Sequence, residues 1–132
     1  MTSTTRAVAE RLRAAFAAKD LALLGPVLDP KVRWGGPEET EQTCHSRSDV
    51  LAWYGQAQAA GMDAEVTETI ALDAAVVLAL AMSGPALGPN AKRPGTVFQV
   101  FHLADGLVVD IRGFERRAQA VAFADKPLRA RG

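Results

Sequence analysis

The chain has 132 residues, of which 48% are hydrophobic, and its 15 basic and 15 acidic side chains leave no net charge. This length supports one domain with a real core and is too short for two, so we expect a single domain over residues 1–125 and a basic tail over 126–132. The charge balance gives no reason to expect nucleic acid, an anionic membrane or a polyanion as a partner, and a neutral or apolar small molecule fits better.

The first part of the chain predicts two helices. Between about residues 5 and 19, apolar side chains recur at helical spacing and charged ones fill other positions, which is typical of an amphipathic helix. Asp20 can cap a second, shorter helix. The Gly-Pro pair at 25–26 interrupts that helix and the Asp-Pro pair at 29–30 ends it, because proline cannot continue a helix from within.

A short strand is predicted next, over residues 31–34, and the Gly-Gly-Pro run at 35–37 ends it. Strand alternation places Val32 and Trp34 on one face and Arg33 on the other. An acidic loop follows this strand and leads to the next helix.

A third helix is predicted from a capping pattern. Ser46 and Asp49 form the sequence S-x-x-D, in which the serine hydroxyl accepts from a free helix amide and the aspartate favours the positive helix end. The helix should run to about Ala60, because a glycine follows and stops it. Trp53 and Tyr54 belong to its apolar stripe.

The second half of the chain predicts four strands, over about residues 64–72, 75–83, 96–103 and 107–114. The Asp-Gly pair at 105–106 is a hairpin signal, and we expect all neighbouring strands to be antiparallel. A short amphipathic helix follows the last strand. The segment 84–95 is too rich in proline and glycine for regular structure, and it is either a mobile flap or an ordinary surface loop.

This order of elements favours an α+β domain with helices covering one face of the sheet. The stretches DPKVRW, HSRSDVLAWY and ADGLVVDIRGFERRAQAVAFA resemble the nuclear transport factor 2-like superfamily, particularly its SnoaL-like branch, over about residues 6–124. The resemblance implies a strongly curved antiparallel sheet wrapped around the N-terminal helices, as in a cystatin-like cone or α+β barrel. It also implies an internal cavity and frequent dimerisation through the outer sheet face.

Strand alternation sorts the side chains of the last two strands between this expected cavity and the exterior. The apolar sets should face inward, and they are Val97, Gln99, Phe101 and Leu103 on one strand and Leu107, Val109, Ile111 and Gly113 on the other. Gln99 then lies among apolar neighbours, which costs roughly 2 kcal/mol or more unless the amide is hydrogen-bonded. This amide is either a ligand-binding group or is satisfied by neighbouring backbone.

Two mechanisms of the superfamily lack their acids in this chain. The resemblance places the protonated acid of ketosteroid-isomerase-like enzymes at Gln99, and their general base near Trp34 or Gly35. It places the aspartate of limonene-epoxide-hydrolase-like enzymes close to Gly113. Since none of these side chains can act as the required acid or base, both mechanisms are disfavoured.

SnoaL-like polyketide cyclases are a looser template, in which an acid or base in the cavity promotes intramolecular aldol closure of a bound chain. On this template the catalytic candidates are Gln99, which would polarise an oxygen, and His45 or Tyr54, which would move a proton. The candidate ligand-binding residues are Trp34, Trp53, Phe101, Ile111 and Gly113. The alternatives are a surface loop for His45 and ordinary core packing for the aromatic residues.

A polar cluster is expected on the outer face of the sheet. His102 shares that face with Asp110 and Arg112, so the three either orient a catalytic histidine or form a salt-bridged patch between two copies of the chain. We favour the patch, because alternation places all three away from the cavity. Together with Val100 it is the expected homodimer surface.

The remaining reactive residues predict no cofactor and no metal. Cys44 and His45 are adjacent in an extended segment and point to opposite sides, and two histidines with one cysteine give no metal-ligand spacing. A single cysteine suits a reducing compartment. The N-terminus lacks the apolar centre of a signal peptide and no apolar run reaches the ~18 residues of a membrane span, so we expect a cytoplasmic protein.

Two hypotheses about function follow. The first is a SnoaL-like, cofactor-independent cyclase, isomerase or hydrolyase acting on an apolar carbonyl compound of polyketide or terpenoid type. The second is a non-catalytic ligand-binding or dimeric interaction domain of the same fold. An open cavity that reaches Gln99, with a mouth near His45, would favour the enzyme, whereas a cavity closed by aromatic side chains would favour the second hypothesis.

Overall fold

The computed structural model describes residues 3–36, 38–41, 43–83 and 95–126. Its helices are α1 (Ser3–Ala18), α2 (Leu21–Leu24), the 3-10 turn η1 (Gly25–Val27), α3 (Arg47–Ala59) and α4 (Arg117–Asp125), and its strands are β1 (Leu28–Gly35), β2 (Asp63–Ala71), β3 (Ala75–Ser83), β4 (Gly95–Ala104) and β5 (Leu107–Phe114). Within these ranges, no helix is long and apolar enough to cross a membrane. Most of the predicted loop at 84–95, and the tail beyond residue 126, lie outside the described residues.

Local signals start most of these elements, as predicted. The Asp20 side chain accepts a hydrogen bond from the backbone two residues later, at 2.9 Å, and starts α2. Ser46 Oγ accepts from the Asp49 amide at 3.1 Å and starts α3. At the turn between β4 and β5, Asp105 and Gly106 have φ angles of 53° and 81°, the left-handed pair that a type I′ hairpin turn requires.

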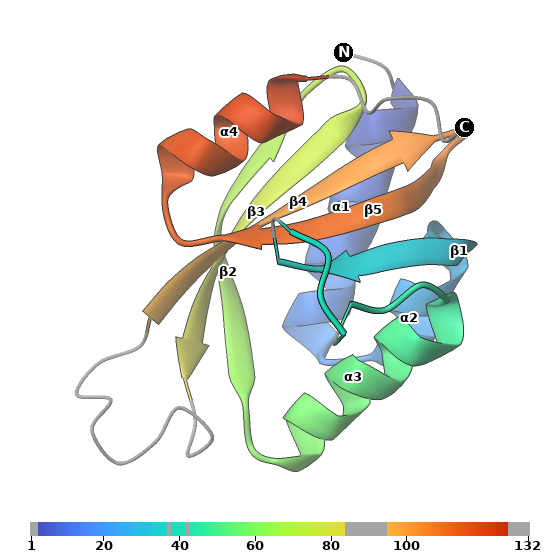
Figure 1. The fold of residues 1–132 in the computed structure, drawn as a ribbon, viewed down its shortest axis with the longest axis vertical. Helices are drawn as coiled ribbons and strands as arrows, with labels where there is room; N and C mark the ends of the chain where they lie inside the picture. Colours follow the sequence, from blue (N-terminus) through green and yellow to red (C-terminus); the bar gives the residue numbers. More distant parts are fainter. Residues whose placement is uncertain (1–2, 37, 42, 84–94, 127–132) are drawn as a thin grey trace.

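The strands form one five-stranded sheet in the order β1-β5-β4-β3-β2, so β1 and β2 are its edges and the sheet does not close (Figure 1). Strands β2 to β5 form the predicted antiparallel meander. However, β1 pairs with β5 in parallel, which makes the sheet mixed. The α+β class is therefore confirmed, and the prediction of an all-antiparallel sheet is corrected at one edge.

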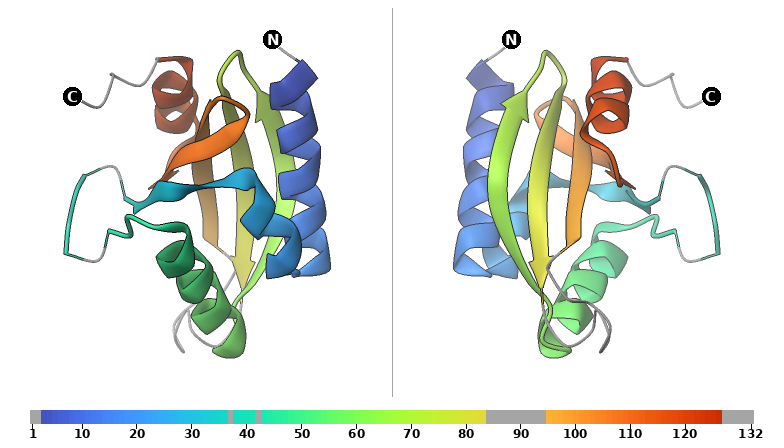
Figure 2. Two further views of the ribbon diagram at one scale, coloured as in Figure 1. Left: turned by 90° about the vertical axis from the view of Figure 1, so that its right-hand side faces the viewer. Right: turned by 90° about the vertical axis from the view of Figure 1, so that its left-hand side faces the viewer.

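Helices pack on both faces of the sheet, although the sequence predicted only one covered face. Figure 2 shows α1 on one side of the strands and α4 on the other. The helix α4 buries Ala120 and Ala124 against the outer face, together with Ala75, Val77 and Val100 from β3 and β4. The small alanine side chains let this helix lie close to the strands, so the outer face is covered by the chain itself.

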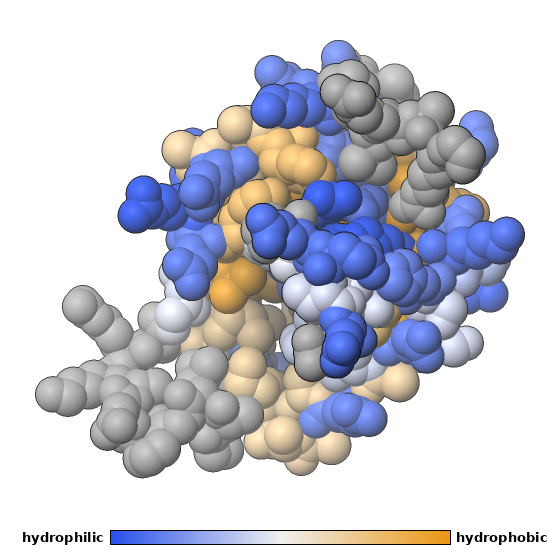
Figure 3. Space-filling view, viewed as in Figure 1, coloured by the Kyte–Doolittle hydropathy of each residue, from blue (hydrophilic) through white to orange (hydrophobic). Residues whose placement is uncertain are grey.

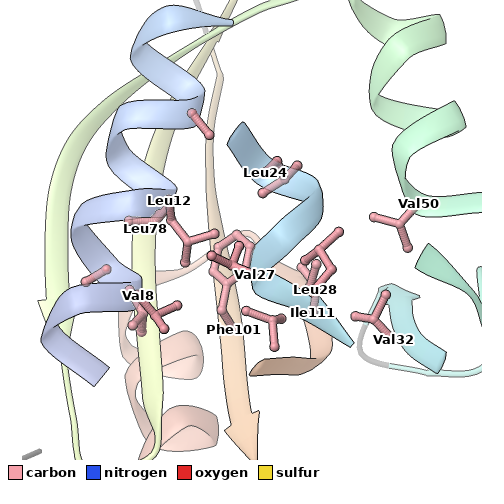
Figure 4. Packing of buried hydrophobic residues seen from close by; sticks show 14 of the residues in the cluster. Val8, Leu12, Leu24, Val27, Leu28, Val32, Val50, Leu78, Phe101 and Ile111 are labelled. Carbon is pink, nitrogen blue, oxygen red and sulfur yellow. The ribbon is translucent and has the colours of Figure 1, made fainter. Parts of the chain in front are cut away.

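The larger core fills the inner face, beneath α1, α2 and α3. Figure 4 shows Leu12 of α1, Phe101 of β4 and Ile111 of β5 converging there with side chains from η1 and β1. All three are fully buried. Burying side chains of this size contributes about 1.5–3 kcal/mol each, so this cluster is the main source of stability for the inner layer.

A bulge in β5 changes which of its side chains face inward. His102 of β4 pairs with Asp110, but the next residue, Leu103, pairs with Val108, so Val109 is the extra residue of the bulge. Val108 is consequently fully buried in the inner core, whereas Val109, which alternation placed there, is only partly buried. The prediction that Ile111 and Gly113 face inward is therefore correct, because both follow the bulge. The prediction for Leu107 and Val109 is wrong, because the bulge turns Val108 inward instead.

Candidate functional site

A cavity of about 400 Å³ lies between the inner face of the sheet and the helices α1 and α3. The ends of α1 and β1, the second half of α3, the start of β2 and the inner faces of β3, β4 and β5 supply its walls. It occupies the end of the inner layer that the packed core leaves unfilled. This hollow is the candidate for the internal cavity that the family resemblance implies.

Aromatic side chains form one wall of this cavity. The rings of Trp34 and Trp53 stack at a tilt with their centroids 4.0 Å apart, and Tyr54 meets both rings edge-on. Phe16 meets the Tyr54 ring edge-on at 5.8 Å from the other side. Offset and edge-on ring contacts are favourable and leave flat apolar surface exposed, so this wall suits a planar or hydrocarbon-rich ligand.

The polar centre of the cavity is a hydrogen bond between two buried side chains. The Tyr54 hydroxyl donates to Gln99 Oε1 at 3.0 Å. Burial raises the pKa of Tyr54 well above its ordinary value, and the contacts of its hydroxyl with Trp34 and Gln99 only partly oppose this rise. Tyr54 therefore stays neutral, and its proton is held by Gln99.

The same hydrogen bond bears on the two interpretations of Gln99, as a ligand-binding group or as an amide satisfied by the backbone. Its oxygen is satisfied by a side chain rather than by the backbone, and among the described residues its Nε2 has no hydrogen-bond partner. Gln99 lines the cavity and is 7% exposed, so Nε2 is available to a ligand. A carbonyl oxygen is the acceptor that such a donor would bind.

A second donor lies behind the aromatic wall. The indole N–H of Trp34 is near enough to the Tyr54 hydroxyl to lower its pKa, but it forms no hydrogen bond of good geometry, and Nε1 is buried without an acceptor among the residues that the structure describes. The hydroxyl of Tyr54 still has a lone pair for it.

Charged side chains stand at the mouth of the cavity. Lys19 Nζ and Asp63 Oδ1 form an ion pair at 3.0 Å that joins the end of α1 to the start of β2. Both side chains line the cavity and are about half exposed. Among the described residues that line the cavity, Asp63 is the one with a carboxylate side chain. Neither Asp63 nor Lys19 was identified as a site residue from the sequence.

Gly113 lies directly opposite Gln99 in the sheet and leaves room beside its amide. A Cβ added at Gly113 would meet the nearest side-chain atom, Val97 Cγ1, at 3.7 Å, which is ordinary contact. The absence of a side chain at this position therefore enlarges the cavity next to Gln99.

The structure brings together five of the eight residues predicted for the site. Trp34, Trp53, Tyr54, Gln99 and Gly113 all line the cavity.

The other three lie elsewhere. Phe101 and Ile111 are fully buried in the inner core and contribute packing, so the prediction that they contact ligand is corrected. The cavity lining does not include His45, whose ring is exposed and whose Nε2 lies 2.7 Å from Glu39 Oε2. Lys19 and Asp63 form an exposed, charged edge of the cavity, and His45, near which an opening would have favoured the enzyme hypothesis, is not part of the lining.

The expected homodimer patch is covered by the chain itself. His102 and Asp110 are buried, with His102 Nε2 3.1 Å from the Lys126 carbonyl oxygen at the end of α4. Arg112 donates to Asp110 at 3.0 Å and lies over the Phe123 ring of α4. His102, Asp110 and Val100 are buried within the chain, so their assignment to an interface is corrected, whereas the Arg112 side chain is 26% exposed.

A buried arginine extends this polar cluster towards β1. Arg33 Nε lies 3.9 Å from Asp110 Oδ1, and the guanidinium donates to the carbonyl oxygens of Gly36 and Glu38. Figure 3 shows hydrophilic residues gathered over β1 and the segment that leads from it to α3. These contacts tie that segment to the sheet and position Gly36, which lines the cavity.

The structure gives little support to thiol chemistry at Cys44. Burial raises the pKa of the Cys44 thiol, and Asp49 raises it further, so the thiolate is disfavoured. Its backbone pairs with Trp34 in an isolated bridge. The part of the chain that the structure describes also contains no cluster of three or more His, Cys, Asp or Glu side chains that could hold a metal ion.

Comparisons with known proteins agree on the fold. A family model described as the SnoaL-like domain matches residues 9–111. Similar solved structures include a candidate polyketide cyclase from Sinorhizobium meliloti, with 19% identity and a TM-score of 0.63 over 79% of this chain and 90% of that chain. A candidate ketosteroid isomerase from Kribbella flavida has 19% identity and a TM-score of 0.70, over 88% of this chain and 80% of that chain.

A third similar structure is a protein of unknown function with a cystatin-like fold from Xanthomonas campestris, with 21% identity and a TM-score of 0.66 over 92% of this chain and 98% of that chain. Identities this low demonstrate a shared fold and transfer no function. No curated protein shows significant sequence similarity to this chain. Because the family model spans most of the sequence, the chain belongs to the SnoaL-like domain family.

Proposed function

We propose that this chain binds a small, largely apolar carbonyl compound in its cavity, with the carbonyl oxygen accepting a hydrogen bond from Gln99 Nε2. The observation that carries the proposal is the buried contact in which Tyr54 donates to Gln99 Oε1 at 3.0 Å. This contact holds the amide in one orientation and directs its remaining donors to the ligand. A donor fixed in an apolar site binds a carbonyl more strongly than the same group in water, because water does not compete.

The class of ligand follows from the cavity walls. Trp34, Trp53 and Phe16 offer aromatic surface, and Leu80 and Met82 of β3 close the opposite side. A few placed polar groups in a mostly apolar cavity of this size are typical of sites for small organic molecules. Polyketide- and terpenoid-like carbonyl compounds have this combination of a hydrocarbon body and a carbonyl oxygen.

Two matched probes test the role of Gln99. Methyl naphthyl ketone and ethylnaphthalene have the same carbon skeleton, and the ketone carries a carbonyl oxygen where ethylnaphthalene has two hydrogens. Binding can be followed by the fluorescence of Trp34 and Trp53, which line the cavity. The wild-type protein should bind the ketone about 3–10-fold more tightly, the equivalent of one net hydrogen bond. Gln99→Leu should remove this preference and still bind ethylnaphthalene.

The matched control is Gln119→Leu, because Gln119 is exposed on α4. This variant should keep the wild-type preference for the ketone. Equal affinity of the wild-type protein for both probes, or no binding of either, would show that the proposed function is wrong.

Catalysis of the isomerase or cyclase type is the second candidate function, and the Asp63 carboxylate at the cavity mouth is the observation that favours it. This function needs a ligand position with the ketone near the mouth, unlike the position at Gln99, in which the carboxylate can remove a proton from the carbon next to the carbonyl group. The test is deuterium incorporation into the methyl group of methyl naphthyl ketone in D₂O, followed by NMR. Asp63→Asn should abolish any protein-dependent exchange.

His45→Gln is the matched comparison, since the His45 ring is exposed and outside the cavity lining. It should leave deuterium exchange unchanged, and a loss of exchange would restore His45 as the proton carrier. Exchange no faster than in protein-free buffer would leave ligand binding as the function.

A homodimer and a cytoplasmic location remain predictions from the sequence.

A further inference from the structure

The residue that ends α1 has an unusual backbone conformation. Lys19 has a φ angle of 54°, in the left-handed region that favours glycine. Its amide donates to the Phe16 carbonyl oxygen at 3.2 Å, and the Asp20 amide donates to the Ala15 carbonyl oxygen at 3.0 Å. This pattern of helix termination most often has glycine at the position of Lys19. A strained residue kept where glycine would fit points to a role for its side chain.

The Lys19 side chain stands at a junction between two hollows. It lines the cavity described above and also a groove of about 550 Å³ that runs between α1 and β2. Asp63 lines both hollows as well and holds Lys19 Nζ at 3.0 Å. The Lys19 side chain is 59% exposed, so a ligand that extends out of the cavity can reach the ammonium group.

The ammonium group has donors to spare. Lysine carries three N–H donors, and one contact with Asp63 leaves others free to bind an oxygen of the ligand. The other cation that lines the groove, Arg13, is held by both carboxylate oxygens of Glu10, at 3.1 and 3.2 Å. Arg13 lines the groove and not the cavity, so among the described residues Lys19 is the cation best placed to receive an anion at the cavity.

We propose that Lys19 selects ligands that carry a carboxylate at the end opposite their carbonyl group. The apolar body would occupy the aromatic cavity with its carbonyl oxygen at Gln99, and the carboxylate would accept a hydrogen bond from Lys19 at the mouth. Asp63 orients the ammonium group. This inference rests on the proposed function and adds the substrate class, an amphipathic keto acid.

Acetylnaphthoate and acetylnaphthamide test this proposal, because they share one ketone-bearing body and differ in the charge at its far end. At low ionic strength the wild-type protein should bind the carboxylate at least about fivefold more tightly than the amide, and added salt should reduce this preference. Lys19→Met should equalise the two affinities. Lys31→Met, at an exposed site on β1, is the matched control and should keep the preference.

Lys19→Gly separates ligand recognition from folding. Glycine accepts the left-handed conformation without strain, so the variant should have a melting temperature no lower than the wild-type value and should still lose the preference for the carboxylate. Equal binding of both probes by the wild-type protein, with Gln99→Leu still weakening both, would overturn the role of Lys19 and leave the proposed function intact. Binding of neither probe, with methyl naphthyl ketone still preferred over ethylnaphthalene, would overturn the role of Lys19 alone. Tighter binding of an acetylnaphthyl ammonium probe would assign recognition to Asp63 and overturn the role of Lys19.

Discussion

The hydrogen bond between Tyr54 and Gln99 can be measured by a double-mutant cycle. Tyr54→Phe removes one hydroxyl and keeps the ring contacts with Phe16 and Trp34. It leaves Gln99 Oε1 without its donor in a buried position, which should cost about 1–2 kcal/mol of unfolding free energy. Gln99→Leu leaves the Tyr54 hydroxyl without its acceptor and should cost about 1 kcal/mol.

The double variant decides whether the two side chains act as a pair. With both polar groups gone, no buried donor or acceptor is left unsatisfied, so the double variant should be about 1 kcal/mol more stable than the sum of the single effects predicts. For a domain of this length, 1 kcal/mol is about 3–6 °C in melting temperature. Urea unfolding followed by the fluorescence of Trp34 and Trp53 would measure each free energy. Additive effects within about 0.3 kcal/mol would refute the pairing of Tyr54 with Gln99, and with it the argument that Gln99 is held for a ligand.

Three further predictions test other parts of the structure. Phe101→Ala should lower the unfolding free energy by about 3–5 kcal/mol in urea, because the ring is fully buried in the inner core; an unchanged stability would return Phe101 to the list of ligand contacts. The Arg117 guanidinium, 2.8 and 3.0 Å from Glu68, lowers the pKa of that carboxyl, so this pair stabilises the fold above the ordinary carboxyl pKa and is lost as pH falls through the lowered value. Arg117→Ala should therefore make the melting temperature fall less steeply as the pH is lowered into the acid range. An unchanged dependence of the melting temperature on pH would contradict the contact between Arg117 and Glu68. Burial lowers the pKa of His102, with the Lys126 carbonyl opposing, so the unfolded chain takes up this proton first and stability should fall as pH drops through the ordinary histidine pKa of about 6.5. His102→Gln should remove that part of the decline, and melting curves of the variant that parallel wild type between about pH 7 and pH 5 would argue against a buried neutral His102.

Local sequence features predicted most of the individual elements. The caps at Asp20 and Ser46 and the hairpin turn at Asp105 depend on side chains and dihedral angles within a few residues, and the structure confirms each of them. Alternation on β4 correctly placed Gln99 and Phe101 on the inner face. These predictions succeed because a cap, a turn or a pleat is determined by neighbouring residues.

Predictions that needed long-range information failed. The bulge at Val109 reverses the faces of β5, and nothing in an alternating run marks the extra residue. The helix α4 crosses to the outer face and covers His102 and Asp110, so a patch that looked exposed on one strand is buried. The parallel pairing of β1 with β5 was also missed, because an alternating strand reads the same in either direction.

Some residues of the candidate site could be identified from the sequence, and others required the structure. Trp34, Trp53, Tyr54 and Gln99 could be selected from the sequence, since an amide on an apolar face and aromatic residues at helical spacing are visible without a structure. The ion pair of Lys19 with Asp63 could not, because each residue lies in an ordinary polar position next to a turn. The sequence by itself determined the α+β class and the apolar, aromatic character of the cavity, through periodicity and composition. Only the tertiary structure decided where the cavity opens and which charges meet there, because that depends on how the end of α1 packs against the start of β2.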